Sequence, residues 1–314
     1  MASQRDVKNR ISSVKNIQKI TRALETVAAA RLRRAEQRIE ALRPYADALR
    51  RMTRHAAQAA GAEASRLPLL AEHDSTTNVG LLLVTGDRGL AGGFNSQIIR
   101  AGVRVADDYA ESGLQTVWYA TGRRGVSSLT FRGHELNGSY TGFADKPAYA
   151  DARSIADDLI TAYADGELDR VEIVYNAYIS PLTQRVARET LLPISHATIA
   201  GEPGDDAADG SNQAPATPSA GESPNGPRAL VSYEPEPEEI LKRLVPDYVE
   251  VSIYRALLES TASEHGARMT AMRNASDNAG TLIEDLTLEM NRARQAEITQ
   301  EIMEVVAGAE GLAG

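Results

Sequence analysis

The sequence predicts a mixed α and β fold: a long antiparallel coiled coil of the N- and C-terminal helices plus a small central Rossmann-like α/β domain. Three observations predict it. Apolar residues recur at helical spacing near both ends of the chain, and the middle alternates strand and helix patterns. Aromatic residues make up only 5% of the chain, which suits narrow helix seams better than one large core.

The first helix is expected within an N-terminal coiled-coil segment, residues 1–66. Apolar residues recur there at steps of three and four, with slips in phase where two equal steps follow each other. Pro44 is the one proline in this run and is expected to kink the helix. The stripe consists of Val7, Ile11, Val14, Ile17, Ile20, Leu24, Ala28, Leu32, Ala35, Ile39, Leu42, Ala46 and Leu49.

The central α/β unit is expected over residues 67–200, because strand-like and helix-like segments alternate there. Residues 201–228 are rich in Gly, Pro, Ser and Asp, which predicts a disordered loop. The predicted strands are 78–85, 115–120 and 170–178, with edge strands at 185–192 and 229–233, and the predicted helices are 95–111, 125–131 and 148–163.

The chain is expected to return through a strand and a short helix, residues 229–245, and to end in a second long helix, residues 246–314. Pro246 is suited to the first turn of that helix. Its apolar stripe includes Ile283, Leu286, Ile298 and Ile302. Two helices with such narrow stripes most simply cover each other as an antiparallel pair.

Charge is uneven along the chain. The net charge is -9, yet residues 1–66 hold 15 Lys and Arg against 6 Asp and Glu. A basic helix can contact nucleic acid, an anionic lipid surface or an acidic protein. Glu25, Glu36 and Glu40 interrupt the basic run, which disfavours nucleic acid. No stretch of eighteen apolar residues occurs, so we expect no membrane span in this chain.

Little in the sequence indicates catalysis. The glycine-rich turn at residues 85–95 either holds a phosphate on backbone N–H groups or is a structural tight turn, and it lacks the Lys-Ser/Thr pair of a nucleotide-binding loop. The five histidines are scattered and there is no cysteine, which disfavours a metal site or a thiolate nucleophile. We therefore expect neither a catalytic site nor a bound cofactor in this chain.

Three blocks together resemble the gamma subunit of the rotary, proton-translocating F-type ATP synthase in its bacterial form. The similarity covers essentially the whole chain. The blocks are IQKITRALETVAAARLRRAE at residues 17–36, DRGLAGGFN at 87–95, and ASDNAG at 275–280 followed by NRARQAEITQE at 291–301.

The resemblance implies a rotor that stands in the bore of a hexamer of three alpha and three beta subunits. In that family the α/β domain is the foot, which sits with the epsilon subunit on the membrane c-ring. One copy of the rotor serves each complex, and the alpha and beta subunits hold ATP, ADP and magnesium. It would lie at the cytoplasmic face of the bacterial cell membrane as a peripheral subunit, touching the membrane only through the c-ring.

The resemblance also implies roles for individual residues. Arg294, Gln295 and Thr299 match the positions that catch a loop of the beta subunit, although ordinary exposed helix residues would look alike. Tyr233 and Glu234 match the foot region that meets the c-ring and epsilon. Met290 departs from a position that is commonly aromatic in the family, and the loop at 201–228 is longer than usual. Residues expected along the hexamer bore or the helix seam are Leu24, Ile283, Leu286, Ile298 and Ile302.

Overall fold

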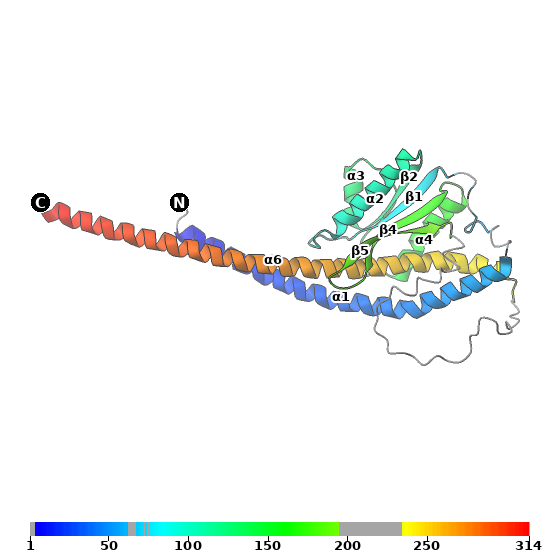
Figure 1. Cartoon of the computed structure of the whole chain (residues 1–314), viewed down its shortest axis with the longest axis horizontal. Helices are drawn as coiled ribbons and strands as arrows, with labels where there is room; N and C mark the ends of the chain where they lie inside the picture. Colours follow the sequence, from blue (N-terminus) through cyan, green and yellow to red (C-terminus); the bar gives the residue numbers. More distant parts are fainter. Residues whose placement is uncertain (1–3, 62–66, 72, 74–75, 195–233, 314) are drawn as a thin grey trace.

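The computed structural model describes residues 4–61, 67–71, 73, 76–194 and 234–313. Two long helices run side by side as a rod, and an α/β domain covers one end of it (Figure 1). We call the two helices the shaft. The C-terminal helix continues past the N-terminus at the end of the rod away from the α/β domain (Figure 1). The predicted fold class is confirmed.

The first shaft helix, α1, spans Gln4–Ala60. It contains no glycine, and its Ala, Leu and Arg residues favour a helix throughout. The helix continues through Pro44 without interruption, and it bends gradually over its later part (Figure 1). Packing along its length therefore outweighs the hydrogen bond that the proline removes.

The phase of the α1 seam differs from the prediction. Ile17 and Ile20 are exposed, while Thr21 is buried against α6. The positions that face α6 keep alternating steps of four and three without the expected slips, because a continuous pair of supercoiled helices follows a 3.5-residue period. That period passes through polar residues in the middle of the shaft. The facing positions are Val7, Ile11, Val14, Gln18, Thr21, Glu25, Ala28, Leu32 and Ala35.

The second shaft helix, α6, spans Pro237–Ala313, 77 residues, a length of about 115 Å. The prediction that it begins at Pro246 was wrong. Pro237 occupies the first turn, with Glu238 and Glu239 beside the positive end of the helix dipole. Pro246 lies inside the helix, where the burial of Val245 and Val249 on its two sides offsets the cost of an internal proline, about 3 kcal/mol.

The α/β domain is built on a five-stranded sheet in the order β3-β2-β1-β4-β5. Neighbouring pairs among the first four strands in that order are parallel, and β5 runs antiparallel to β4. The sequence prediction missed β3, a short edge strand, and correctly placed β5 at the other edge. The strands are β1 (Asn78–Val84), β2 (Gln115–Thr121), β3 (Leu136–Tyr140), β4 (Arg170–Tyr178) and β5 (Gln184–Leu192).

Helices cover both faces of this sheet. Helix α2 (Phe94–Glu111) and helix α3 (Arg123–Phe131) cover one face, whereas α4 (Tyr149–Ala164) and α6 cover the other (Figure 1). Alternate strand residues point to opposite faces, so Leu81 and Leu83 join the α2 side while Leu82 and Val84 join the α6 side. The shaft is therefore part of the hydrophobic core of the α/β domain.

Several expectations fall on residues outside the described ranges. These are the disordered loop at 201–228, the edge strand at 229–233, and Tyr233 as a contact of the c-ring. They stay predictions. The domain boundaries given above also stay predictions, apart from the start of the second long helix.

Candidate functional surfaces: the projecting tip and the junction

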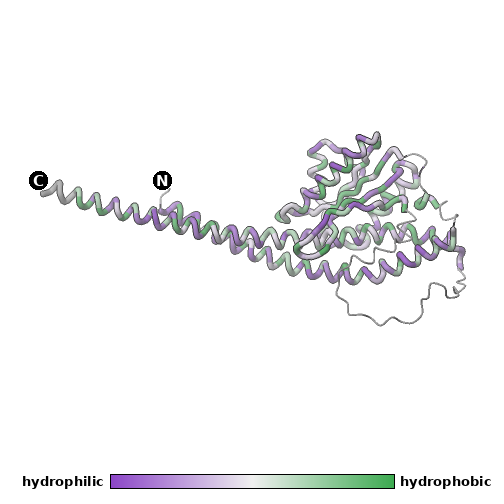
Figure 2. Tube along the Cα trace, in the orientation of Figure 1, coloured by the Kyte–Doolittle hydropathy of each residue, from purple (hydrophilic) through white to green (hydrophobic). Residues whose placement is uncertain are grey.

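Over residues 294–307, the end of α6 projects without a neighbour among the residues that the structure describes. Every side chain from residue 294 to residue 307 is exposed, and we call this segment the tip. Apolar and polar residues alternate along the tip (Figure 2), and Ile298 and Ile302 are 47% and 57% exposed. Exposed apolar residues do not stabilise a helix that stands alone. The tip therefore has the composition of a surface that another molecule covers.

The residues predicted to catch a partner lie on this tip. Arg294, Gln295 and Thr299 are all exposed, and the hydroxyl of Thr299 donates to the backbone oxygen of Gln295 at 2.8 Å. The structure thus places them together on one accessible helix. Glu234, predicted to contact the c-ring, is exposed just before α6 begins.

The residues predicted for the bore or the seam divide into three environments. Leu286 is buried with Val7 and Ile11, and Ile283 packs against the same cluster, so these two belong to the seam. Leu24 is half-buried and lines a cavity of about 400 Å³ between α1 and the loop after β1. Ile298 and Ile302 belong to the exposed tip.

A second exposed apolar stripe of α1 lies beside the seam, and at Val27 it borders the cavity of about 400 Å³ described above. Ile17, Ile20 and Val27 are 53%, 59% and 49% exposed, because the strict seam period turns them away from α6. Sequence reasoning missed this stripe because it assigned the isoleucines to the seam. Counting steps of four and three from Val7 would have revealed it.

Hydrogen bonds within the chain hold the glycine-rich turn after β1 in place. The carboxylate of Asp87 accepts the backbone N–H groups of Arg123, Gly142 and Ala144 at 3.0, 3.0 and 3.2 Å, so it caps the start of α3 from another loop. The N–H of Gly86 donates to Asn95 Oδ1 at 2.8 Å. Because the N–H of Gly86 and the carboxylate of Asp87 both have partners within the chain, these contacts favour the structural alternative over a phosphate cradle.

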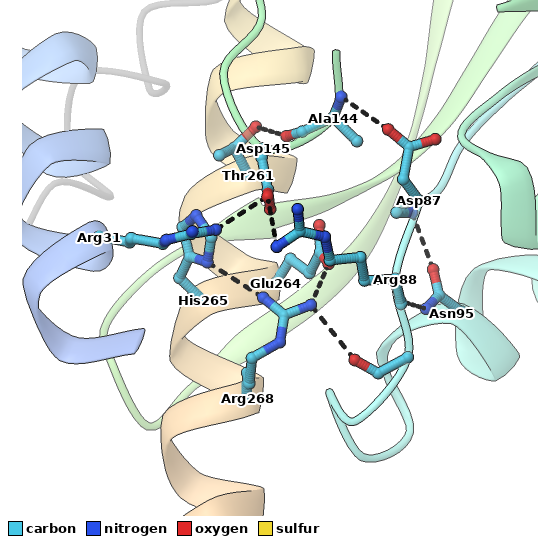
Figure 3. Close-up of polar contacts among 12 residues, drawn as sticks. Arg31, Asp87, Arg88, Asn95, Ala144, Asp145, Thr261, Glu264, His265 and Arg268 are labelled. Carbon is cyan, nitrogen blue, oxygen red and sulfur yellow. Dashed lines mark hydrogen bonds and ion pairs between the residues drawn. The ribbon is translucent and has the colours of Figure 1, made fainter. Parts of the chain in front are cut away.

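Charged residues gather where the loops of the α/β domain meet the shaft, and Figure 3 shows this cluster, which we call the junction. Asp145 Oδ2 accepts from Arg31 Nη1 of α1 at 2.8 Å and from Arg88 Nη1 at 3.1 Å. Beneath them Glu264 and Arg268 of α6 form an ion pair. The junction consists of Arg31, Arg88, Asp145, Glu264, His265 and Arg268.

Close approach of backbone and carboxylate explains one glycine of the turn. A Cβ atom built on Gly86 would lie 2.7 Å from the Glu264 carboxylate, too close for any side chain. Gly122, with φ of +81° and an added Cβ 2.1 Å from the oxygen of Thr85, is required where α3 begins. The turn therefore comes close enough to α6 for Arg268 Nη2 to donate to the oxygen of Gly89 at 3.3 Å.

Burial changes the titration of the junction. Burial, assisted by the positive charge of Arg268, lowers the pKa of His265 to about 4. Burial raises the pKa of Glu264, although the guanidinium of Arg268 opposes that shift. His265 is therefore neutral at physiological pH, with Nδ1 3.1 Å from Arg268 Nη1.

The described part of the chain holds neither a group of metal-ligating side chains nor a helix that could span a membrane. No group of three or more His, Cys, Asp or Glu side chains there is placed to hold a metal ion. No described helix is both long enough and apolar enough to cross a membrane.

Comparison with known sequences identifies close relatives over the full length. The sequence model of the family described as "ATP synthase" matches residues 3–312. The chain is 42% identical to the ATP synthase gamma chain of Rubrobacter xylanophilus over 316 aligned positions, covering 100% of this chain and 99% of the relative. It is 41% identical to that of Moorella thermoacetica, covering 99% of this chain and 100% of the relative.

Comparison with solved structures finds the same fold. The central stalk and c-ring structure of the Tetrahymena thermophila mitochondrial ATP synthase contains a chain with a TM-score of 0.59 and 24% identity, covering 82% of this chain and 99% of that one. A chain of the Euglena gracilis mitochondrial ATP synthase has a TM-score of 0.66 and 16% identity, covering 98% and 94%.

Proposed function

The chain belongs to the ATP synthase gamma family, and from this premise we propose that it is the rotating central shaft between a membrane c-ring and a hexamer of three alpha and three beta subunits. In this proposal one copy serves each complex, and the α/β domain sits with the epsilon subunit on the c-ring. The single observation that carries the proposal is the tip. Its fourteen residues belong to one helix, are exposed on every side, and extend past the N-terminal end of α1 (Figure 1).

The paired helices and the exposed tip give the shaft the two properties that it needs, which are stiffness and a surface for its partners. Because α6 is paired with α1, the shaft resists twisting from the α/β domain as far as the N-terminal end of α1. A single rod in a threefold bearing contacts three identical subunits differently. To swing a site from mostly one state to mostly the other takes about 5.5 kcal/mol of differential contact, and rotation would deliver it to each site in turn.

This proposal assigns the chemistry to the partners. ATP, ADP and magnesium would bind to the alpha and beta subunits, and this chain would act on them only through contact. Arg294, Gln295 and Thr299 would contact a loop of the beta subunit, and Leu24 would face the lower rim of the hexamer. The complex would lie at the cytoplasmic face of the bacterial membrane.

The absence of cysteine from the chain allows a direct test. A Gln295→Cys variant is assembled with its partner subunits and oxidised to a disulfide with a cysteine in the surrounding beta subunit. We expect multi-site ATP turnover to fall at least about 100-fold, since a site that cannot change state cannot release product, and to return on reduction.

The matched control ties the shaft to itself. A Val14→Cys/Ile283→Cys variant joins α1 to α6 in the cluster where both residues pack, without touching a partner. We expect its turnover to survive oxidation. Unimpaired turnover of the fully tethered Gln295→Cys complex would contradict the proposal.

A further inference from the structure

The junction contains one carboxylate that connects three separate segments. Asp145 lies in the loop between β3 and α4, Arg88 in the turn after β1, and Arg31 on α1. A single oxygen of Asp145 accepts from both guanidinium groups, at 2.8 and 3.1 Å. Figure 3 shows Arg31 reaching across from α1 toward the loops of the α/β domain.

The space around this contact is not filled by side chains. A cavity of about 430 Å³ lies on one side, between Arg34, Arg38 and Lys146. The cavity of about 400 Å³ described above lies on the other side, and Arg31 lines both. At this level α1 packs closely on α6 through Leu32, Ala35 and Ala262, whereas the contact of Arg31 with the loops of the α/β domain is polar.

Packing holds α1 and α6 to the α/β domain very unequally. Ile253, Ala256 and Leu257 of α6 are buried in the core cluster with the sheet. The residues of α1 that join that cluster, Ala56 and Ala57, lie in its last turns. Closer to the middle of α1, Tyr178 at the end of β4 packs against the small cluster of Leu32 and Ala35, and its hydroxyl donates to Glu36. Beyond Tyr178, the contact of α1 with the α/β domain is the ion pair of Arg31 with Asp145.

We propose that Asp145 is a positioning residue: through Arg31 and Arg88 it holds α1 at a fixed distance from the α/β domain, so that torque on this domain enters both shaft helices instead of α6 alone. The mechanical consequence rests on the proposed function. The distance between α1 and the α/β domain does not, because it is a property of this chain.

Spin labels measure that distance directly. Ala30→Cys on α1 and Ala150→Cys on α4 are small exposed positions outside the junction, and the chain has no other cysteine. In the labelled full chain we expect one narrow distance distribution. We expect Asp145→Asn to widen it about twofold, because a segment that loses its contacts opens locally. Asp145→Glu, which keeps the charge, should restore most of the narrow distribution.

The effect of salt distinguishes an electrostatic role of Asp145 from a role in packing alone. Arg31 is 40% exposed and Asp145 28% exposed, so 1 M salt, where the screening length is about 3 Å, should widen the distribution in the parent chain but not in Asp145→Asn. The matched control is Arg273→Gln, which removes the ion pair with Glu25 at 2.9 Å between α1 and α6. It should leave the label distance unchanged.

The mechanical consequence is read in the assembled complex. With rotation stalled, a bead on the α/β domain should fluctuate in angle with about twice the variance in Asp145→Asn. An unchanged label distribution in Asp145→Asn would overturn the proposal. A widened distribution with unchanged bead variance would overturn the claim that torque enters through α1. If the parent chain failed to assemble with its partners at all, that result would contradict the proposed function and leave the label measurement valid.

Discussion

The two ends of α6 show how differently one helix can use the same kind of residue. Near the α/β domain, Val249, Ile253 and Leu257 are buried between the sheet and α1. On the tip, Ile298 and Ile302 recur with the same spacing of four and are exposed. The spacing therefore defines a face of the helix without saying what covers that face. Near the α/β domain, other parts of this chain cover that face, whereas on the tip a partner would cover it.

The largest difference in the free energy of unfolding is expected between substitutions of two arginines, one buried and one exposed. Arg268→Met removes the partner of buried Glu264, so we expect the free energy of unfolding to fall by about 3–5 kcal/mol. Arg294→Met, the same change on the exposed tip, should alter it by less than about 0.5 kcal/mol. Urea denaturation of both variants makes the measurement. Equal losses would show that the tip is not free in the isolated chain, and a Glu264→Gln/Arg268→Met double variant should recover part of the loss.

A somewhat smaller contrast is expected between isoleucines. Ile253→Ala leaves a cavity in the core beside the sheet, which should cost about 2–5 kcal/mol. Ile302→Ala on the tip should cost less than about 0.5 kcal/mol in the isolated chain, yet it should weaken association with the partner subunits. Denaturation and a binding titration separate the two effects. The interpretation of the tip as a covered surface fails if Ile302→Ala binds as tightly as the parent chain.

The smallest effect concerns pH at the junction. Because the pKa of His265 is lowered from 6.5 to about 4 in the folded chain, the unfolded chain binds more protons between these values. Stability from this residue is complete above pH 6.5 and is lost as the pH falls toward 4, up to about 3 kcal/mol.

The groups that face His265 keep this test specific. Arg31, Arg88, Asp145 and Arg268 act on it from α1, two loops and α6. They remain in a His265→Gln variant, whose stability should fall less steeply than that of the parent between pH 6.5 and 4. His134→Gln, at a histidine beside Trp118 and away from the junction, is the control. Parallel pH profiles of the parent and His265→Gln would rule out this role for His265.

Much of the fold followed from local patterns. The long helices, the strands β1, β2 and β4, and the edge strand β5 could be predicted, because each carries a run or a period of apolar residues. The antiparallel direction of β5 was not predicted. The short edge strand β3 could not, since LNGSY contains one strongly apolar residue and a glycine. The start of α6 was misplaced because Pro237 and Pro246 both suit the first turn of a helix. Which proline begins the helix depends on whether the residues between them are buried, as Leu241 and Val245 are.

The candidate surfaces were predicted in part. The resemblance to the family singled out Arg294, Gln295 and Thr299 on the second long helix, and their exposure fits the prediction without testing their contacts. The junction could not be predicted, because Arg31, Asp145 and Glu264 are far apart in the sequence. The resemblance to a family identified blocks of sequence and did not indicate which charges meet.

By itself, the sequence determined that this chain forms two long helices and a small, mostly parallel sheet, because the pattern of apolar residues is a property of neighbouring positions. Only the tertiary structure decided that Thr21 faces α6 while Ile20 faces outward, that Asp145 joins α1 to the α/β domain, and how far α6 extends past α1. Those outcomes depend on how two helices and a domain fit together as whole bodies, and a local pattern carries no information about the register between segments hundreds of residues apart.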